Sequence, residues 1–259
     1  APGNSAIQAS ASRAFAQKRT WKAARHFAEK ASHSGYSHGR YRLAYILGKF
    51  GNKTEQKQAG EILIDLFSKG AANVGIPLGI GYFTGIYGLR KNTGKAIKTW
   101  EKAFRISKNS VVKSRLISEI ALTYRDNLPS RKLNYKKALA LHKLGIKLDP
   151  KNGINYRHIG NIYAKGQGVK KSWHIARAFY TEGAARADVW SYVYLARIYR
   201  DGQGVAKNLK KAAKLYQFAI IRGNKAAGRD VKVLLQQADA AEKRSDKKTK
   251  ALFTILTTG

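Results

Sequence analysis

The chain has 259 residues, 44% hydrophobic and 10% aromatic, which is enough apolar material for a substantial core. It contains no cysteine, which excludes disulfides, thiolate catalysis and cysteine-bound zinc. No stretch approaches the ~20 apolar residues of a membrane helix. The formal net charge is +35, which favours polyanions such as nucleic acid, an acidic polysaccharide or an anionic membrane surface. A solvated basic surface without a partner is the alternative.

Helical spacing of apolar residues begins near the amino terminus and recurs along the chain. The pattern predicts a first helix over residues 20–35, which resembles the second half of a two-helix unit. It then predicts helical hairpins from the paired segments 41–48 with 59–70, 77–85 with 94–104, and 114–127 with 135–152. Residues 224–241 can form a closing helix. The chain therefore reads as a series of helical hairpins.

The clearest repeat covers residues 153–223, where two copies are offset by 36 residues. Eight positions of the first copy match the second: Tyr156, Ile159, Tyr163, Gly166, Gly168, Val169, Ala176 and Tyr180 match Tyr192, Leu195, Tyr199, Gly202, Gly204, Val205, Ala212 and Tyr216. Apolar residues at i, i+3 and i+4 flank each glycine pair. Each copy is predicted to be a helix, a glycine turn and a second helix, which buries its apolar face only against stacked neighbours.

The glycine pairs admit two interpretations. Gly166 and Gly168 precede a helix, where free backbone N–H groups can hold an anion. However, Gly166 stands where a helix C-cap is expected, and Gly168 permits the positive φ of a chain reversal. Because Gly202 and Gly204 repeat this arrangement, we interpret all four as structural turns.

The spacing Leu195-Ala196, Tyr199, Gly202-x-Gly204-Val205, Lys211-Ala212 and Tyr216 resembles a Sel-one-like repeat (SLR), a relative of the tetratricopeptide repeat (TPR). The resemblance implies an all-α, right-handed α-solenoid of stacked helix-turn-helix repeats with a concave face. We expect residues 1–12 to be an N-terminal extension and residues 13–240 to form about six hairpins. Residues 241–259 would form a basic connector with a short apolar tail at 251–256.

Residues that could carry catalysis are scarce. The 15 acidic residues include no close pair suited to general acid–base chemistry, and the serines lack a nucleophile-elbow sequence. His33 and His38 share a polar loop without further metal ligands at suitable spacing. We therefore predict a protein that is not an enzyme and has no cofactor or metal.

Tyrosines and arginines alternate on the helices that would line the concave face. These candidate binding residues are Tyr41, Tyr45, Tyr156, Arg157, Tyr192, Arg197 and Arg200. Tyrosine rings can stack on sugars or bases, while guanidinium groups meet carboxylates or phosphates. The alternative is that the tyrosines pack between helices and the cations are solvated. If the arginines bind a polyanion, charge reversal there should weaken binding and spare the fold.

Helical repeats without catalytic residues usually present a surface to other macromolecules. The chain is loosely similar to periplasmic SLR scaffolds of alginate-type exopolysaccharide secretion. That similarity implies an extracytoplasmic scaffold in a multi-protein assembly, with a basic surface for acidic proteins or an acidic polysaccharide. The start Ala1-Pro2-Gly3 would suit signal-peptidase processing. The alternatives are a nucleic-acid-binding repeat protein, which the charge favours, and a cytosolic adaptor that binds acidic peptides.

Overall fold

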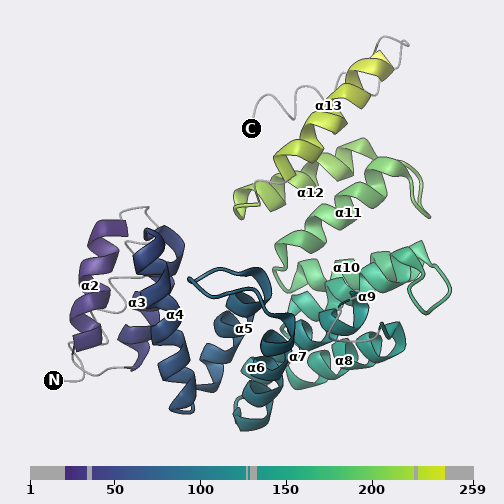
Figure 1. Cartoon of the computed structure of the whole chain (residues 1–259). Coiled ribbons are helices and arrows are strands. Elements are labelled where there is room, and N and C mark those ends of the chain that lie inside the picture. The colour runs from purple at the N-terminus through teal and green to yellow at the C-terminus, as the bar shows by residue number, and fades with distance from the viewer. Residues whose placement is uncertain (1–20, 34–36, 127, 129–132, 225–226, 243–259) are drawn as a thin grey trace. The chain divides into compact units, whose positions relative to one another are not determined.

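A computed structural model describes residues 21–242 except 34–36, 127, 129–132 and 225–226 (Figure 1). In these residues the chain forms twelve α-helices and no β-strand, so the predicted all-α fold of helical hairpins is confirmed. The helices divide into two compact units, Ala1–Leu133 and Asn134–Gly259. The predicted N-terminal extension and the predicted apolar tail lie outside the described residues.

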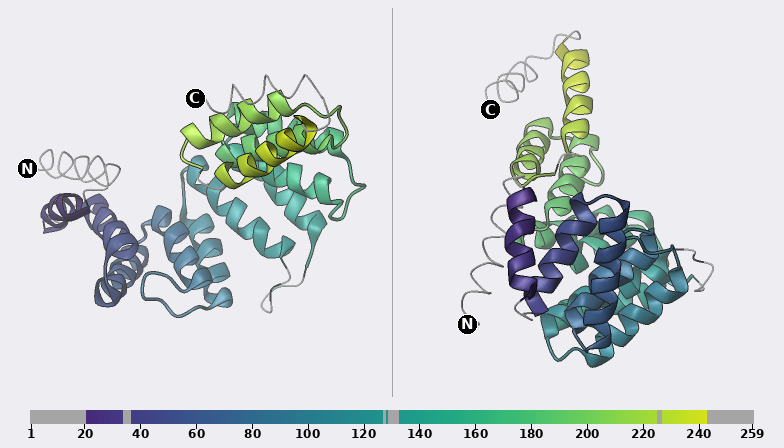
Figure 2. Two further views of the ribbon diagram at one scale, coloured as in Figure 1. Left: turned by 90° about the horizontal axis from the view of Figure 1, so that it is seen from above. Right: turned by 60° about the vertical axis from the view of Figure 1, so that its left-hand side comes forward.

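Unit 1 contains six α-helices, and consecutive helices pack against one another (Figures 1 and 2). They are α2 (Trp21–His33), α3 (Ser37–Phe50), α4 (Lys53–Ser68), α5 (Gly75–Thr84), α6 (Thr93–Ile106) and α7 (Ser110–Arg125), with a short 3₁₀ turn, η1 (Ala72–Val74), before α5. The pairs α3–α4 and α5–α6 are two of the hairpins predicted from the sequence, whereas α7, which was expected to pair with residues 135–152, packs against α6.

Unit 2 also contains six α-helices in consecutive contact. They are α8 (Tyr135–Leu148), α9 (Gly153–Lys165), α10 (Trp173–Ala185), α11 (Val189–Asp201), α12 (Leu209–Ile221) and α13 (Ala227–Glu242). The hairpins α9–α10 and α11–α12 begin and end at positions 36 residues apart, the offset found in the sequence. Within the described residues of the two units, every helix is too short or too polar to traverse a lipid bilayer.

Asparagine, serine and aspartate define where most helices begin. In each case a side-chain oxygen accepts a hydrogen bond from a backbone N–H of the first turn, which satisfies a donor that has no partner inside the helix. The capping residues are Asn52, Asn92, Asn109, Asn134, Asn152, Ser172, Asp188 and Asn208. At Asn52 the cap is reciprocal, because Glu55 accepts from the Asn52 N–H.

The glycine turns connect the helices of each hairpin in unit 2. Gly166 and Gly202 end α9 and α11 at φ +67° and +69°, and Gly168 and Gly204 follow at +69° and +68°. Residues that carry a side chain rarely adopt this left-handed backbone conformation. A Cβ on Gly204 would also lie 2.8 Å from the Cβ of Trp173, at the start of α10. Gly204 thus combines a backbone requirement with close packing on the preceding hairpin.

In three of the hairpins a large ring packs against a small residue in the core. In α9–α10, a Cβ on Gly160 would lie 2.6 Å from the ring of Tyr180. In α11–α12, Tyr216 and Ala196 belong to one buried cluster. In α5–α6, Gly79 approaches the indole of Trp100, which is fully buried. The small residues let two helices approach closely while the rings fill the space between them.

Candidate partner-binding surface

Arg157, on α9, is held by Asp188, the N-cap of α11. Its Nε donates to Asp188 Oδ2 at 3.0 Å, and the two side chains are 15% and 6% exposed. The same carboxylate accepts from the backbone N–H and the hydroxyl of Ser191. Asp188 therefore caps one hairpin and binds the arginine of the preceding one.

Arg197 and Arg200 converge on Asp230 of α13. Arg197 Nη2 lies 2.8 Å from Asp230 Oδ2, and Arg200 Nη1 lies 3.3 Å from Asp230 Oδ1. Arg200 also donates to Asp201 at 2.7 Å and to the hydroxyl of Tyr216. Hydrogen bonds to Asp230 and Asp201, respectively, raise the pKa of Arg197 and of Arg200. These contacts connect α11 to α13.

The ion pairs correct the expectation that charge reversal at these three arginines spares the fold. Reversing a partly buried cation places two negative charges together, which is strongly destabilising. Binding of a partner by Arg157, Arg197 and Arg200 stays a prediction. Their charge is already satisfied by carboxylates within unit 2.

The predicted tyrosines of unit 2 are also covered by cations of the chain. Tyr156 is 8% exposed, and the guanidinium of Arg186 lies 4.2 Å from its ring centroid. Tyr192 is half-buried between Phe218, at 5.9 Å between centroids, and Arg222, at 5.4 Å. Such cation–π contacts occupy the ring faces that stacking on a sugar or base would need.

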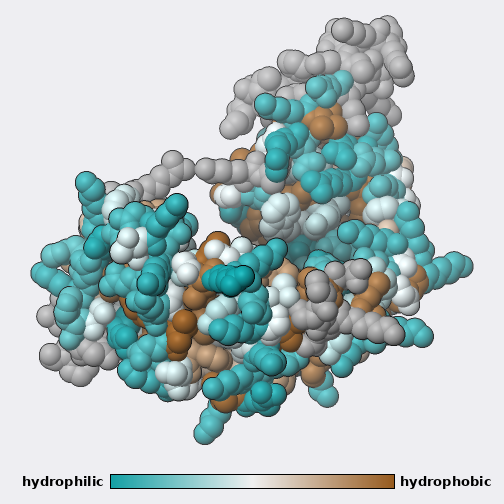
Figure 3. Space-filling model, viewed as in Figure 1, coloured by the Kyte–Doolittle hydropathy of each residue, from teal (hydrophilic) through white to brown (hydrophobic). Residues whose placement is uncertain are grey.

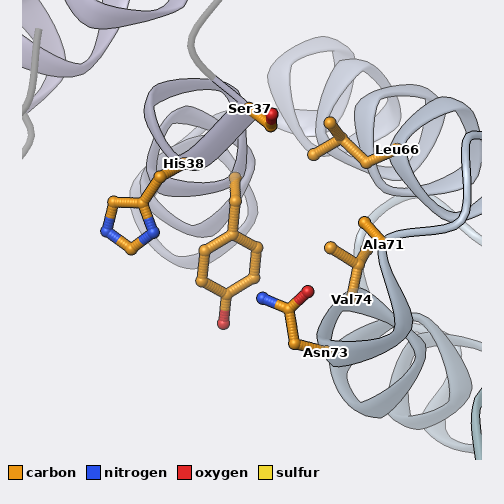
Figure 4. A pocket seen from close by; sticks show the side chains of 7 residues that line it. Ser37, His38, Leu66, Ala71, Asn73 and Val74 are labelled. Carbon is orange, nitrogen blue, oxygen red and sulfur yellow. The ribbon is translucent and has the colours of Figure 1, made fainter. Parts of the chain in front are cut away.

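In unit 1 the two predicted tyrosines have different surroundings. The Tyr45 hydroxyl accepts from Lys49 Nζ at 3.1 Å, and Arg42 lies over its ring. Tyr41 lines a hollow of about 330 Å³ together with His38, whose ring centroid is 6.2 Å away, and Asn73 of η1. In Figure 4 the Asn73 amide turns toward this space, and Leu66 and Val74 form its apolar side. Tyr41 is the predicted residue of unit 1 that borders a cavity.

A second hollow, of about 230 Å³, lies between the two hairpins of unit 2. Its aromatic lining is Trp173, Tyr180 and Tyr194, and its charged lining is Lys165, Arg197 and Asp201. The rings of Tyr180 and Tyr194 stack at 5.1 Å, and the Tyr180 hydroxyl donates to Asn161 at 2.7 Å. Burial raises the pKa of Tyr180. Of the predicted binding residues, Arg197 reaches this hollow.

The lining residues that the repeat pattern missed lie where the two copies differ. Tyr194 corresponds to His158, and Trp173 corresponds to Leu209. Matching positions such as Tyr180 and Tyr216 are buried core residues. A difference between otherwise similar copies is therefore the sequence signal that marks these surface-lining residues.

Exposed lysines make up much of the basic surface of the described residues. Most ion pairs in the described residues join an arginine to a carboxylate, so the few acidic residues are largely occupied. Exposed lysines form rows on three helices: Lys95, Lys98 and Lys102 on α6, Lys136, Lys143 and Lys147 on α8, and Lys210 and Lys214 on α12. Hydrophilic residues cover much of the face drawn in Figure 3.

The described residues contain no group of three His, Asp or Glu that could hold a metal ion. The scattered hydrogen-bonded carboxylates above serve as caps and ion-pair partners.

Solved structures share this fold. A Sel1 repeat protein from Oxalobacter formigenes aligns with 85% of this chain and 86% of its own, at a TM-score of 0.63 and 22% identity. The immunity protein Pa5087 from Pseudomonas aeruginosa aligns with 74% of this chain and 67% of its own, at 0.54 and 20%. No protein-family model matches the sequence, and no curated protein matches it significantly. The chain has the helical-repeat fold of Sel1 repeat proteins.

Proposed function

We propose that the protein is a non-catalytic interaction scaffold whose lysine-rich surface binds acidic partner proteins. One observation carries the proposal: arginines neutralise most described carboxylates inside the fold, while rows of exposed lysines remain on α6, α8 and α12. The lysine ammonium group is a hydrated point charge on a flexible stem, so it suits acidic surfaces of varied geometry. Arginine is better suited to bidentate recognition of a carboxylate in one fixed position. The repeat fold supplies the extended surface that such binding needs.

Binding by these rows would be the sum of many weak contacts. An exposed ion pair contributes only ~0.2–1 kcal/mol and is screened by salt. Several lysines acting on one partner would raise the association rate and the affinity together. The proposal therefore predicts affinity that falls steeply with ionic strength.

A finer form of the proposal places the scaffold in exopolysaccharide production or secretion, outside the cytoplasm. Support comes from the net charge of +35, which suits a polymer with a carboxylate on every sugar. The resemblance of the repeats to periplasmic scaffolds gives it further support. A fold alone does not define a function, so the polymer must be tested directly.

Affinity chromatography on poly-L-glutamate, a polyuronate and duplex DNA at one ionic strength tests the proposal. A nonspecific polycation binds duplex DNA most strongly, because DNA carries one charge per ~1.7 Å. We expect the protein to elute from polyglutamate at a salt concentration equal to or above that for DNA. Later elution from the polyuronate than from polyglutamate would favour the exopolysaccharide form.

A pair of matched variants distinguishes the contribution of the lysine rows to binding from that of the net charge. Replacing Lys143, Lys147 and Lys214 by glutamine should move elution from polyglutamate to lower salt, because these exposed lysines would contact the polymer. Replacing three lysines among residues 243–250, which lie outside the described residues, removes the same charge without touching the lysine rows. Equal shifts in the two variants, or stronger retention on DNA than on either carboxylate polymer, would contradict the proposal.

A further inference from the structure

A groove in unit 1 combines an apolar floor with one of the lysine rows. It has a volume of about 280 Å³ and lies between α4 and α6, with α5 beneath it. Ile64 and Ser68 of α4 form one wall, and Lys95, Lys98, Thr99 and Lys102 of α6 form the other. The floor consists of Phe67 of α4 with Leu78 and Tyr82 of α5. None of the binding residues predicted from the sequence is among these lining residues.

The lysines form a straight row along the groove. Their spacing of i, i+3 and i+7 places them on one side of α6, over about 10 Å at 1.5 Å per residue. Lys95 Nζ lies 5.3 Å from the ring centroid of Tyr82, and Lys102 Nζ lies 5.5 Å from that of Phe67. The rings thus hold two of the ammonium groups at the groove edge.

The floor of the groove is apolar and well supported. Phe67 and Leu78 are 8% and 2% exposed, whereas Ile64 on the rim is 42% exposed. Beneath them, Trp100 donates from Nε1 to the carbonyl of Ile76 at 3.3 Å. Glycines at the contact between α5 and α6 let Trp100 pack closely, so these two helices form a firm base. Apolar surface is visible where α4 and α5 lie in Figure 3.

The lining of the groove contains no carboxylate. Asp65 of α4 binds Arg40 and Lys69, at 2.6 Å and 3.0 Å, and does not line the groove. Glu61 of α4 and Glu101 of α6 lie outside the lining as well. The groove therefore carries three lysines and no acidic side chain in its walls.

These features select one class of partner. The volume of about 280 Å³ is at the lower end of the ~300–1,000 Å³ of small-molecule sites, and it has room for one or two side chains of a larger molecule. A nucleic-acid backbone has no apolar group to fill the floor, and the rings of Phe67 and Tyr82 are already covered by lysines. A flat membrane surface cannot reach apolar residues recessed between two helices. An amphipathic helix with apolar and acidic residues can place an apolar side chain on the floor and carboxylates beside the lysines.

We propose that the α4–α6 groove binds an acidic amphipathic helix of a partner protein, with an apolar side chain between Ile64 and Leu78 and carboxylates along Lys95, Lys98 and Lys102. This inference rests on the proposed scaffold function and assigns it a site and a partner chemistry. A partner helix with carboxylates at i, i+3 or i+4, and i+7 matches the lysine row. Its affinity comes from burial of the apolar side chain, and its orientation comes from the charges.

Fluorescence anisotropy of a labelled synthetic peptide tests the proposal on the full chain. The peptide is an amphipathic helix with leucines on one stripe and glutamates beside them, and its control has glutamine at each glutamate. The groove variant replaces Lys95, Lys98 and Lys102 by glutamine. The matched variant replaces Lys136, Lys143 and Lys147, which are equally exposed on α8. A third variant, Ile64→Gln, removes the apolar rim.

We expect the groove variant to lose at least about tenfold in affinity and the α8 variant less than about threefold, since three exposed ion pairs together supply roughly that difference. Ile64→Gln should weaken binding by several-fold without changing its salt dependence. Circular dichroism of each variant checks that the helices remain folded.

Two results would contradict the assignment of the groove as the binding site without contradicting the scaffold function. The first is an equal loss in the α6 and α8 variants, and the second is Ile64→Gln binding like the unchanged chain. Failure of the unchanged chain to prefer the glutamate peptide over its glutamine control would overturn both proposals. Duplex DNA or anionic vesicles could also displace the peptide from the unchanged chain and from the groove variant alike. That result would assign the lysines to general polyanion binding.

Discussion

Replacement of Gly204 by alanine tests how the repeat turns are built. Gly204 has φ +68°, and an added Cβ would lie 2.8 Å from the Cβ of Trp173. Gly223 also has positive φ, +87°, but its Cβ would meet no atom within 4 Å. Gly202 is intermediate, with φ +69° and its nearest contact at 3.4 Å. The three positions separate backbone strain from crowding.

The expected destabilisation follows from these two terms. Alanine in the left-handed region costs ~1–2 kcal/mol, and this applies at all three glycines. Crowding in a packed site adds ~1–3 kcal/mol, and this applies only at Gly204. We therefore expect Gly223→Ala and Gly202→Ala to lose ~1–2 kcal/mol, and Gly204→Ala to lose ~2–5 kcal/mol.

Urea unfolding followed by far-UV circular dichroism measures the loss, with the change in midpoint converted through the common slope. A changed slope in one variant would show that unfolding is not two-state, and hydrogen exchange of the α11 and α12 amides would then replace the titration. Equal losses at Gly204 and Gly223 would refute the packing of the turn on α10. An unaffected Gly202→Ala variant would refute the role of positive φ.

Three further predictions concern caps, ion pairs and pH. Asp188→Ala should lower the free energy of unfolding by ~3–5 kcal/mol, because it leaves Arg157 without its carboxylate. Asp188→Asn keeps an acceptor for Ser191 and should lose less in the same urea titration. Equal losses in the two variants would exclude a role for the charge. Asn208→Ala should cost ~1 kcal/mol, and Asn208→Asp should be nearly neutral, because the N-cap oxygen is kept; a large loss in the aspartate variant would contradict this. Burial raises the pKa of Tyr216 to about 12, and the unfolded phenol ionises near ~10, so the unfolded chain binds fewer protons and stability should fall as pH rises from about 10 to about 12. Tyr216→Phe should flatten that fall, and an unchanged pH profile would show that this tyrosine does not contribute.

The repeat architecture could be predicted because each hairpin carries its own local signals. The 36-residue offset, the glycine pairs and the capping residues are all short-range features, and they correspond to helix boundaries in the structure. Upstream segments such as 41–48 with 59–70 also correspond to a hairpin, α3–α4. There the glycine signature is weak, so the sequence marks the helix boundaries less sharply.

The surroundings of the arginines could not be predicted in the same way. Arg157 meets Asp188 across 31 residues, and Arg197 meets Asp230 across 33. Such pairs depend on how successive hairpins stack, and a sequence with 50 basic residues offers no rule for choosing which of them meet the 15 acids. Placing those arginines on a helix face was possible, whereas their ion pairing required the packed structure.

The α4–α6 groove illustrates a second limit. Its lysine row is a helical pattern that could be seen in the sequence as i, i+3 and i+7. The apolar floor comes from Phe67 and Leu78 on two other helices, and it exists because α4 and α6 leave a space over α5. A row of lysines alone indicates a solvated face, and only its combination with that floor indicates a partner.

We propose that the protein recognises acidic partners through its exposed lysines rather than through its ion-paired arginines. Titration of the full chain with the glutamate peptide and with its glutamine control, at near-physiological ionic strength of about 0.15 M, tests this most directly. We predict at least about tenfold tighter binding of the glutamate peptide, abolished in the Lys95, Lys98 and Lys102 variant. Equal affinity for the two peptides would contradict the claim.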